Sequence, residues 1–400
     1  MNKLCCLIVV FSIYLNNANS QWINLNSGTT KTLNDIKVLN EDTIIIVGDS
    51  GLVLKTIDGG LNWNQYSANI NERLLSVDFL NDSIGIAVIE NGLLRSNNGG
   101  ITWVPYQNLP VNSSFRDVEL INDSIILVAG SFTYGNIIKS FDSGQSWIVD
   151  SLPTVFGFLK LTTAVGFAND STWYAADQAA DIFKTTNKGK SWQLKNLYNS
   201  TSAIERLQVV NDTMVFAVGN TPNCTDCFFS SIDGGNNWYS NYKMGFDLYF
   251  FHTGMGYFLN GKVISKSLDY GINYFDQRIM GLDTFLIAIK FANENIGYAV
   301  GNHGTILKTL NGGITNLNDL SNAAKSLNIY PNPITNELYI KTNSNQPKEI
   351  ILYDITSRKL LQETFSNSTT LNTTQLANGI YIYEVRNKNG VLKQGKVIKE

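Results

Sequence analysis

Acidic and amide side chains recur in this sequence within an eight-residue box, [ST]-x-[DN]-x-G-x-x-W, and paired carboxylates are the groups on which glycoside hydrolysis depends. The first copy reads Thr56-Ile57-Asp58-Gly59-Gly60-Leu61-Asn62-Trp63. The seven copies place the acid or amide with its aromatic residue as follows: Asp58 with Trp63, Asn98 with Trp103, Asp142 with Trp147, Asn187 with Trp192, Asp233 with Trp238, Asp269 with Tyr274, and Asn311 with Asn316 in the aromatic place. An active site is needed once, whereas a turn is needed in every repeat. We therefore interpret the box residues as structural and expect no catalytic role for them.

The spacing of the box predicts the elements that carry it. Successive Asp or Asn positions are 40, 44, 45, 46, 36 and 42 residues apart, and a period of about 40–45 residues is typical of four-stranded propeller blades. Within each copy, the Asp or Asn can accept hydrogen bonds from backbone N–H groups, the glycines permit positive φ, and the aromatic residue packs beneath the turn. The sequence thus predicts an all-β chain with a seven-bladed β-propeller over residues 21–318.

The box resembles the Asp-box of BNR-type propellers, which occur in sialidases, some glucanases and photosystem II assembly factors. This resemblance implies the architecture and does not imply an activity. The seventh copy lacks its aromatic residue, whereas residues 21–25 (Gln-Trp-Ile-Asn-Leu) read as an outer strand without a hairpin. We expect Trp22 to complete the seventh blade, which would close the seam between the first and last blades.

A change of pattern after residue 318 predicts a linker at 319–326 and a second domain at 327–400. Short alternating strands in this domain predict a small Ig-like β-sandwich. Its ordered motifs contain Tyr330, Pro331, Asn332, Pro333, Gly379, Tyr381, Gly395 and Lys396. These motifs resemble the C-terminal sorting domain of the type IX secretion system of Bacteroidetes; the alternative is an ordinary Ig-like accessory module. The resemblance implies the type IX translocon and sorting machinery as partners, and a protein secreted, or attached to the outer cell surface, via the periplasm.

The first twenty residues predict a signal peptide. Lys3 supplies a positive start, residues 4–15 are mostly apolar, and Ala18-Asn19-Ser20 is similar to a small-residue cleavage site. The apolar run is too short to span a bilayer comfortably, so we expect no transmembrane segment in the mature chain. A lipoprotein signal is a weaker alternative, because Cys5 and Cys6 precede the apolar run instead of following it.

Two cysteines remain after cleavage, Cys224 and Cys227, and they would enter an oxidising compartment. A Cys-x-x-Cys pair can be a local disulfide, a redox dithiol or half of a metal site. A redox pair should open a helix beside a βαβ unit, and a zinc site needs two further ligands in a chain whose only histidines are His252 and His303. We therefore expect a disulfide that stiffens a loop, with no metal and no cofactor.

Loops that vary in length between the repeats predict where a ligand binds, since binding residues concentrate on loops of a rigid scaffold. The candidate ligand-binding residues on these loops are Arg73, Phe115, Arg116, Phe132, Tyr134, Phe156, Phe158, Lys160, Arg206 and His303. A second candidate site lies between two apolar columns of the innermost strands, and its residues are Lys37, Asp78, Glu119, Gly166, Gln208, Tyr249 and Lys290. If these side chains face a central channel, they could bind a ligand or simply solvate trapped water.

These residues favour a secreted or cell-surface module that binds a protein or glycan. The alternative is a secreted glycoside hydrolase of sialidase-like or xyloglucanase-like type. Sialidase-like members use three arginines and a tyrosine nucleophile. This propeller has five arginines, and no arginine motif precedes the first box. Xyloglucanase-like members place their acid and base between two propellers, whereas one propeller is expected here. A photosystem assembly role conflicts with an exported chain, and the net charge of −3 argues against a nucleic-acid partner. We therefore expect binding and no enzymatic activity.

Overall fold

The computed structural model describes residues 22–313, except 111–112, 133–134, 154–160, 197–202, 220–226, 278 and 280–281, and residues 327–400, except 343–346, 355–357 and 388–389. The chain divides into two compact units, residues 1–313 (unit 1) and 314–400 (unit 2). The expected signal peptide at 1–20 and the expected linker at 319–326 lie outside the described residues.

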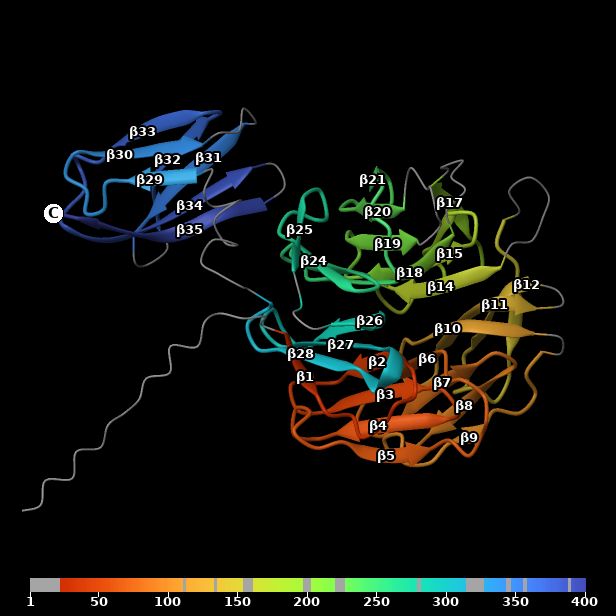
Figure 1. The fold of residues 1–400 in the computed structure, drawn as a ribbon. Coiled ribbons are helices and arrows are strands. Elements are labelled where there is room, and N and C mark those ends of the chain that lie inside the picture. Colours follow the sequence, from red (N-terminus) through yellow and green to blue (C-terminus); the bar gives the residue numbers. More distant parts are fainter. Residues whose placement is uncertain are drawn as a thin grey trace, which may run out of the picture. The chain divides into compact units, whose positions relative to one another are not determined.

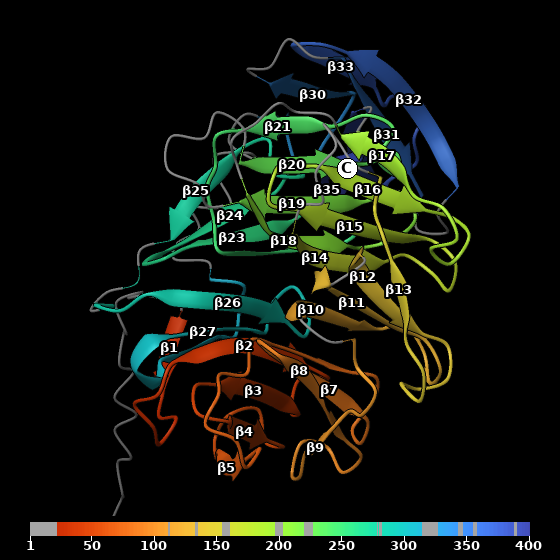
Figure 2. The same ribbon diagram turned by 90° about the vertical axis from the view of Figure 1, so that its right-hand side faces the viewer.

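Unit 1 is built from four-stranded antiparallel sheets that follow one another along the chain (Figures 1 and 2). The described residues form seven such sheets, which we number 1 to 7. Sheets 1 to 3 comprise β2 (Leu33–Val38), β3 (Ile44–Gly48), β4 (Leu52–Thr56) and β5 (Asn64–Ser67); β6 (Ser76–Phe79), β7 (Gly85–Ile89), β8 (Gly92–Ser96) and β9 (Val104–Pro105); and β10 (Ser114–Leu120), β11 (Ile126–Phe132), β12 (Gly135–Ser140) and β13 (Ile148–Asp150).

The remaining sheets of unit 1 repeat the same order of strands. Sheets 4 to 6 comprise β14 (Thr162–Phe167), β15 (Trp173–Asp177), β16 (Ile182–Thr185) and β17 (Gln193–Asn196); β18 (Ile204–Val209), β19 (Val215–Gly219), β20 (Phe228–Ser231) and β21 (Tyr239–Asn241); and β22 (Asp247–Phe250), β23 (Gly256–Asn260), β24 (Val263–Ser267) and β25 (Tyr274–Gln277). Sheet 7 comprises β26 (Leu286–Phe291), β27 (Gly297–Gly301), β28 (Ile306–Thr309) and β1 (Trp22–Leu25), with the 3₁₀ turn η1 (Asn302–Gly304) before β28.

The residue types of the strands account for their places in each sheet. The second strands are mostly apolar and buried, and β3 and β19 are buried along their whole length. Such a strand lacks polar alternation because neighbouring sheets cover both of its faces. The fourth strands are short, and in β5 the sequence Asn-Gln-Tyr-Ser is polar and largely exposed, which protects the outer edge from pairing with other chains. The apolar cores consequently lie between adjacent sheets; one cluster, for example, joins residues of β2–β4 to residues of β26–β28.

The first strand of each sheet lies at the centre of unit 1. These strands contact one another in sequence, β2 with β6, β6 with β10, β10 with β14, β14 with β18, β18 with β22, β22 with β26, and β26 with β2. The series returns to its start, so the first strands form a ring. In β2, β10, β14, β18 and β26 the pairing with the second strand shifts register near the strand's beginning.

Sheet 7 joins the two ends of unit 1, because its outer strand β1 comes from the N-terminal side of the chain (Figure 1). Trp22 of β1 pairs in register with Thr309 of β28, and Ile23 pairs with Lys308. The same geometry occurs in sheet 1, where Lys55 pairs with the residue that follows Trp63. Trp22 is buried; its indole N–H donates to Gln277 Oε1 at 2.9 Å, and its ring meets Phe291 edge-on. Trp22 therefore occupies in sheet 7 the position of the box tryptophan.

The repeated box forms the hairpin between the third and fourth strands. Its Ser or Thr hydroxyl oxygen accepts the backbone N–H of the residue four positions later in every copy: Gly60, Gly100, Gly144, Gly189, Gly235, Gly271 and Gly313 donate to Thr56, Ser96, Ser140, Thr185, Ser231, Ser267 and Thr309 at 2.8–3.1 Å. The Asp or Asn accepts a further N–H across the turn, as Asp58 does from Asn62 at 2.9 Å. These hydrogen bonds within the turn account for the residue types of the box.

Unit 2 contains two sheets that share one apolar core. A three-stranded sheet has the order β29 (Leu327–Tyr330), β30 (Glu337–Thr342) and β33 (Ser368–Asn372). A four-stranded sheet has the order β32 (Lys359–Phe365), β31 (Lys348–Tyr353), β34 (Gly379–Asn387) and β35 (Gly390–Lys399). Residues of both sheets, such as Leu338 and Leu352, are fully buried in the common core. Unit 2 is accordingly all-β, as the sequence predicts.

Candidate functional site

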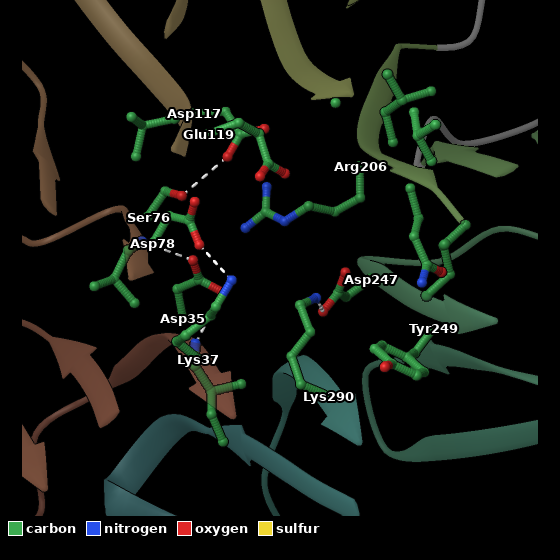
Figure 3. A pocket seen from close by; sticks show the side chains of 18 of the residues that line it. Asp35, Lys37, Ser76, Asp78, Asp117, Glu119, Arg206, Asp247, Tyr249 and Lys290 are labelled. Atoms are coloured by element: carbon green, nitrogen blue, oxygen red, sulfur yellow. Dashed lines mark hydrogen bonds and ion pairs between the residues drawn. The ribbon is translucent and has the colours of Figure 1, made fainter. Parts of the chain in front are cut away.

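A polar cavity lies at the centre of the ring formed by the first strands of unit 1 (Figure 3). Its volume is about 430 Å³, and residues of β2, β6, β10, β14, β18, β22 and β26 line it. The ionisable or polar side chains of the lining are Asp35, Lys37, Ser76, Asp78, Asp117, Glu119, Arg206, Gln208, Asp247, Tyr249 and Lys290. Every first strand thus contributes to one central site, which is rich in charged side chains.

The polar ring that the sequence places between the two apolar columns lies around this cavity. All seven of its residues, Lys37, Asp78, Glu119, Gly166, Gln208, Tyr249 and Lys290, are part of the lining. Period two along a strand sends these side chains to the side opposite the buried apolar columns.

Carboxylates and one amide of the lining accept backbone N–H groups from the next sheet. Asp35 Oδ2 accepts Val77 N–H at 2.9 Å, and Asp78 Oδ2 accepts Leu120 N–H at 2.7 Å. Equivalent bonds run from Val165 to Asp117 at 3.1 Å, from Phe250 to Gln208 at 2.6 Å and from Ile289 to Asp247 at 2.8 Å. Without these acceptors, the backbone N–H groups on the free edge of a first strand would have no hydrogen-bond partner in the protein. An unpaired donor costs free energy in a buried site. The cavity side chains therefore hold neighbouring sheets together.

Two lysines of the lining form ion pairs with these same carboxylates. Lys37 pairs with Asp78, and Lys290 Nζ lies 2.8 Å from Asp247 Oδ2. Burial alone would lower the pKa of Lys37, but the carboxylates of Asp78 and Glu119 outweigh it and raise that pKa above its usual range. Burial likewise opposes the charged form of Lys290, and the carboxylates of Asp247 and Asp35 raise its pKa. Both ammonium groups are therefore fully charged at neutral pH.

Three carboxyl groups of the cavity have raised pKa values. Burial is the largest cause for Asp35 and Asp117, and neighbouring cations such as Arg206 offset it only in part. Burial and the nearby Asp78 carboxylate raise the pKa of Glu119 well above its usual range. Perturbed carboxyl groups that converge on a cavity mark candidate functional sites.

The structure separates the loop residues that the sequence groups as a ligand face. Arg206 reaches the cavity, whereas Arg73, Arg116 and His303 are not part of its lining. Arg73 is exposed near Asp49, and the half-buried Arg116 donates to the carbonyl oxygen of Phe115. The exposed His303 Nδ1 lies 3.3 Å from Thr284 Oγ1.

Two aromatic residues of that predicted face are buried. Phe115 and Phe132 meet edge-on with ring centroids 5.3 Å apart, inside the apolar cluster between sheets 2 and 3. Both side chains therefore lie in the core between these sheets, and neither lines the cavity. The other predicted residues, Tyr134, Phe156, Phe158 and Lys160, lie outside the described residues.

Four cavity residues were absent from the sequence-based candidates: Asp35, Ser76, Asp117 and Asp247. Each precedes a residue of the first apolar column, so period two places it on the same side of the strand as the polar ring. That alternation is the signal in the sequence that would have identified them.

The chain offers no metal site among the residues that the structure describes, where no cluster of three or more His, Cys, Asp or Glu side chains could hold an ion. Cys227 is buried and disulfide-bonded. Its expected partner, Cys224, lies outside the described residues. Within the described part of the chain, no helix has the length and apolar character needed to cross a membrane.

The motifs of unit 2 meet at the end of the chain. The Asn332 side-chain amide donates to the carbonyl oxygen of Lys396 at 3.1 Å and accepts the N–H of Ile398 at 2.9 Å. Tyr381 is buried, and its hydroxyl donates to the carbonyl oxygen of Ala377 at 2.6 Å. A Cβ at Gly395 would lie 2.5 Å from the Tyr383 hydroxyl, which accounts for glycine there. Tyr330, the last residue of β29, stacks on Tyr339 of β30 and is exposed. Pro331 and Pro333 are exposed as well, and Gly379 begins β34.

A ring of four-stranded sheets around a polar centre defines unit 1 as a β-propeller, and comparison with known families agrees. Residues 15–107 match the family described as photosynthesis system II assembly factor YCF48. Residues 328–400 match the family described as secretion system C-terminal sorting domain. The N-terminal part of the chain is thus similar in sequence to YCF48, and its C-terminal domain is similar to secretion sorting domains.

Individual relatives support the same architecture. The chain is 26% identical over 141 residues to the photosystem II assembly lipoprotein Ycf48 of Synechococcus sp. (strain CC9902), a match that covers 32% of this chain and 40% of that protein. Among solved structures, YCF48 bound to D1 peptide shares 18% identity with a TM-score of 0.58, covering 72% of this chain and 97% of that chain. YCF48 from Cyanidioschyzon merolae shares 17% identity with a TM-score of 0.58, covering 72% and 98%.

An enzyme has a comparable fold. A catalytically inactive variant of virginiamycin B lyase from Staphylococcus aureus, with quinupristin, shares 13% identity with a TM-score of 0.60, covering 73% of this chain and 99% of that chain. Likeness at this level shows the fold alone, so the function must be argued from the site.

Proposed function

We propose that this protein is an exported β-propeller binding module that holds a peptide segment of a partner protein at its central cavity. Seven blades closed by β1 form the scaffold in this proposal, and unit 2 is an Ig-like sandwich that directs the chain through the type IX secretion system. The observation that carries the proposal is the central cavity of about 430 Å³, with charged side chains from strands of six sheets. The structural neighbour bound to D1 peptide supports a peptide as the ligand class.

The site favours binding over hydrolysis. Among the described arginines, Arg206 alone lines the cavity, whereas a sialidase-like site needs three. The aspartates of the cavity are engaged by backbone N–H groups or lysines, as Asp78 is by both Leu120 and Lys37. Carboxylates held in this way position neighbouring strands and are poorly placed to act as acid and base on a sugar.

Binding is tested on the full mature chain with acidic, basic and neutral peptide pools and, in parallel, with polysaccharides and sialosides. We expect saturable retention of peptide without release of reducing ends. Retention should be lost in Arg206→Gln and kept in Arg358→Gln, an exposed change in unit 2, with thermal unfolding used to verify that both variants fold. Glycan turnover that a single carboxylate substitution abolishes would refute the binding module.

Export is tested separately by deleting residues 327–400. We expect the deleted protein to be absent from the cell surface and from the medium, because the sorting domain is the part of the chain that matches a secretion family. Export at the level of the full chain would overturn the sorting assignment and leave the binding proposal untouched.

A further inference from the structure

The cavity holds more acidic than basic groups. Its lining contains five carboxyl side chains and three cationic side chains: Asp35, Asp78, Asp117, Glu119 and Asp247 against Lys37, Arg206 and Lys290. A recessed site with an excess of carboxyl groups favours a cation over an anion as its occupant.

Four of the five carboxyl groups already have hydrogen-bond donors. Asp35 accepts two backbone N–H groups, from Ile36 and Val77, both at 2.9 Å. Asp117 accepts the Ser76 hydroxyl at 2.9 Å in addition to the N–H of Val165.

The other two are occupied in the same way. Asp78 accepts the N–H groups of Phe79 and Leu120 and pairs with Lys37, while Asp247 accepts the N–H of Ile289 and pairs with Lys290. These aspartates are therefore committed to holding the ring of strands.

Glu119 is the exception. Within the described residues its half-buried carboxyl group has no hydrogen bond and no ion pair, although it lines the cavity (Figure 3). The strongest cationic influence on Glu119 is that of Lys37, whose ammonium group is already bound to Asp78. A carboxylate without a donor is costly in a buried site, and an entering cation would remove that cost.

The remaining cation of the cavity does not supply this partner. Arg206 donates to the carbonyl oxygen of its neighbour Glu205 at 3.0 Å, and the carboxylates of Asp247, Asp35 and Asp117 raise its pKa against the effect of burial. Its charge is thus balanced mainly by aspartates, and no ion pair joins it to Glu119 among the described residues.

We propose that the central cavity binds a primary amine, such as the side chain of a lysine in the bound peptide, with the Glu119 carboxylate as its counterion. This inference rests on the proposed peptide-binding function and names the chemical group that the cavity recognises. An organic cation fits better than a metal ion, because no three carboxylate or histidine side chains of the described residues converge to ligate one. The volume of about 430 Å³ also exceeds the needs of a single ion.

The test uses small probes that do not depend on peptide binding. Calorimetric titration of the full mature chain compares n-butylamine with n-butyrate, which have opposite charges and similar size. We expect the amine to bind and the carboxylate to show no saturable binding. Tighter binding of butyrate would overturn the proposal, since it would show that the cations of the cavity dominate.

Two matched variants assign the counterion. Glu119→Gln keeps the shape of the side chain, and we expect it to weaken amine binding roughly ten- to a hundredfold, the range for a charge-assisted hydrogen bond. Glu205→Gln makes the same chemical change at a half-buried residue that does not line the cavity, and its amine affinity should match the wild type. Equal affinities in all three proteins would overturn the role of Glu119.

The outcomes separate the two proposals. Peptide retention that Glu119→Gln leaves unchanged, without amine binding, would refute the amine site and support the binding module. Amine binding that depends on Glu119, in a chain that retains no peptide, would support the amine site and refute the peptide-binding function.

Discussion

Lys308 Nζ donates a hydrogen bond of 2.6 Å to the carbonyl oxygen of Gly59, and this bond joins the last sheet of unit 1 to the first. The two residues are 249 positions apart in the chain. The same contact recurs between the third strand of one sheet and the box glycine of the next: Lys55 with Gly99 at 2.9 Å, Lys139 with Gly189 at 2.9 Å, Lys184 with Gly234 at 2.8 Å and Lys266 with Gly312 at 3.0 Å. The box hairpins thus serve as acceptors that join five of the seven pairs of neighbouring sheets.

We predict that Lys308→Met lowers the free energy of unfolding by about 1–2 kcal/mol, because it removes a charged donor from the Gly59 carbonyl while keeping the apolar stem. Tyr298, whose hydroxyl donates to the same oxygen at 3.0 Å, limits the loss. Urea denaturation of the full chain measures the effect. Lys31→Met, at an exposed residue, is the control and should change stability little; a loss as large there would show that charge, not the contact, is responsible.

Removing the Trp22 side chain, which closes unit 1, should lower the free energy of unfolding more than Lys308→Met does. Trp22→Ala should cost about 3–5 kcal/mol, the range for removing a large buried aromatic side chain, since the change also removes the hydrogen bond to Gln277. Ile23→Ala alters the adjacent residue of β1, which is 50% exposed, and should cost less than about 0.5 kcal/mol. Similar losses in both variants would mean that pairing of β1 matters and that the tryptophan position does not.

The box hydroxyl provides a third prediction. Ser96 is buried, and its oxygen accepts the buried N–H of Gly100 at 2.8 Å. We expect Ser96→Ala to cost about 1–3 kcal/mol, because it leaves that donor without an acceptor, while Ser96→Thr retains stability, as three of the other boxes already use threonine. Ser83→Ala, at an exposed hydroxyl, is the matched control. Thermal unfolding of the three variants decides whether the hydroxyl or the volume of the side chain matters.

Much of the fold could be predicted because it is repeated. The box recurs in every sheet, so its period of about 40–45 residues predicts a β-propeller, and the ordered motifs of residues 327–400 predict the sorting domain; both predictions are confirmed. The site was harder to predict. Period two places Lys37 and Glu119 on one side of their strands. The donors to the neighbouring carboxylates, such as the Val77 N–H to Asp35, are backbone groups of another sheet, which have no signature in the sequence.

The positions of the predicted ligand-binding residues were hard to foresee for a related reason. An aromatic residue near the end of a strand is the same residue type whether it packs in the core or faces solvent. Phe115 packs in the core between sheets 2 and 3, and a register shift follows it in the strand. Arg206 was expected on a loop and lies instead at the cavity, because its strand begins two residues earlier, at Ile204. Local irregularities of this kind depend on contacts between sheets, which spacing alone cannot supply.

The cavity acids give the folded protein a pH dependence that tests their environment. The pKa values of Asp35, Asp117 and Glu119 are raised, chiefly by burial, so the folded chain retains protons that the unfolded chain releases. Between the ordinary value and the raised value of each group, the folded state binds more protons, and the contribution of that group to stability falls as the pH rises. Glu119 therefore destabilises the fold progressively above its ordinary pKa of 4.5.

We predict that Glu119→Gln, which cannot ionise, has a stability close to the wild type at a pH of about 4 and becomes the more stable protein as the pH rises through the raised pKa of Glu119. Urea denaturation of both full chains in small pH steps measures this difference. Glu205→Gln should show no such growth, because its side chain lies outside the cavity lining. A difference that shrinks with rising pH would mean that the Glu119 carboxylate is stabilised in the fold, and it would remove the need for a cationic ligand to accompany it.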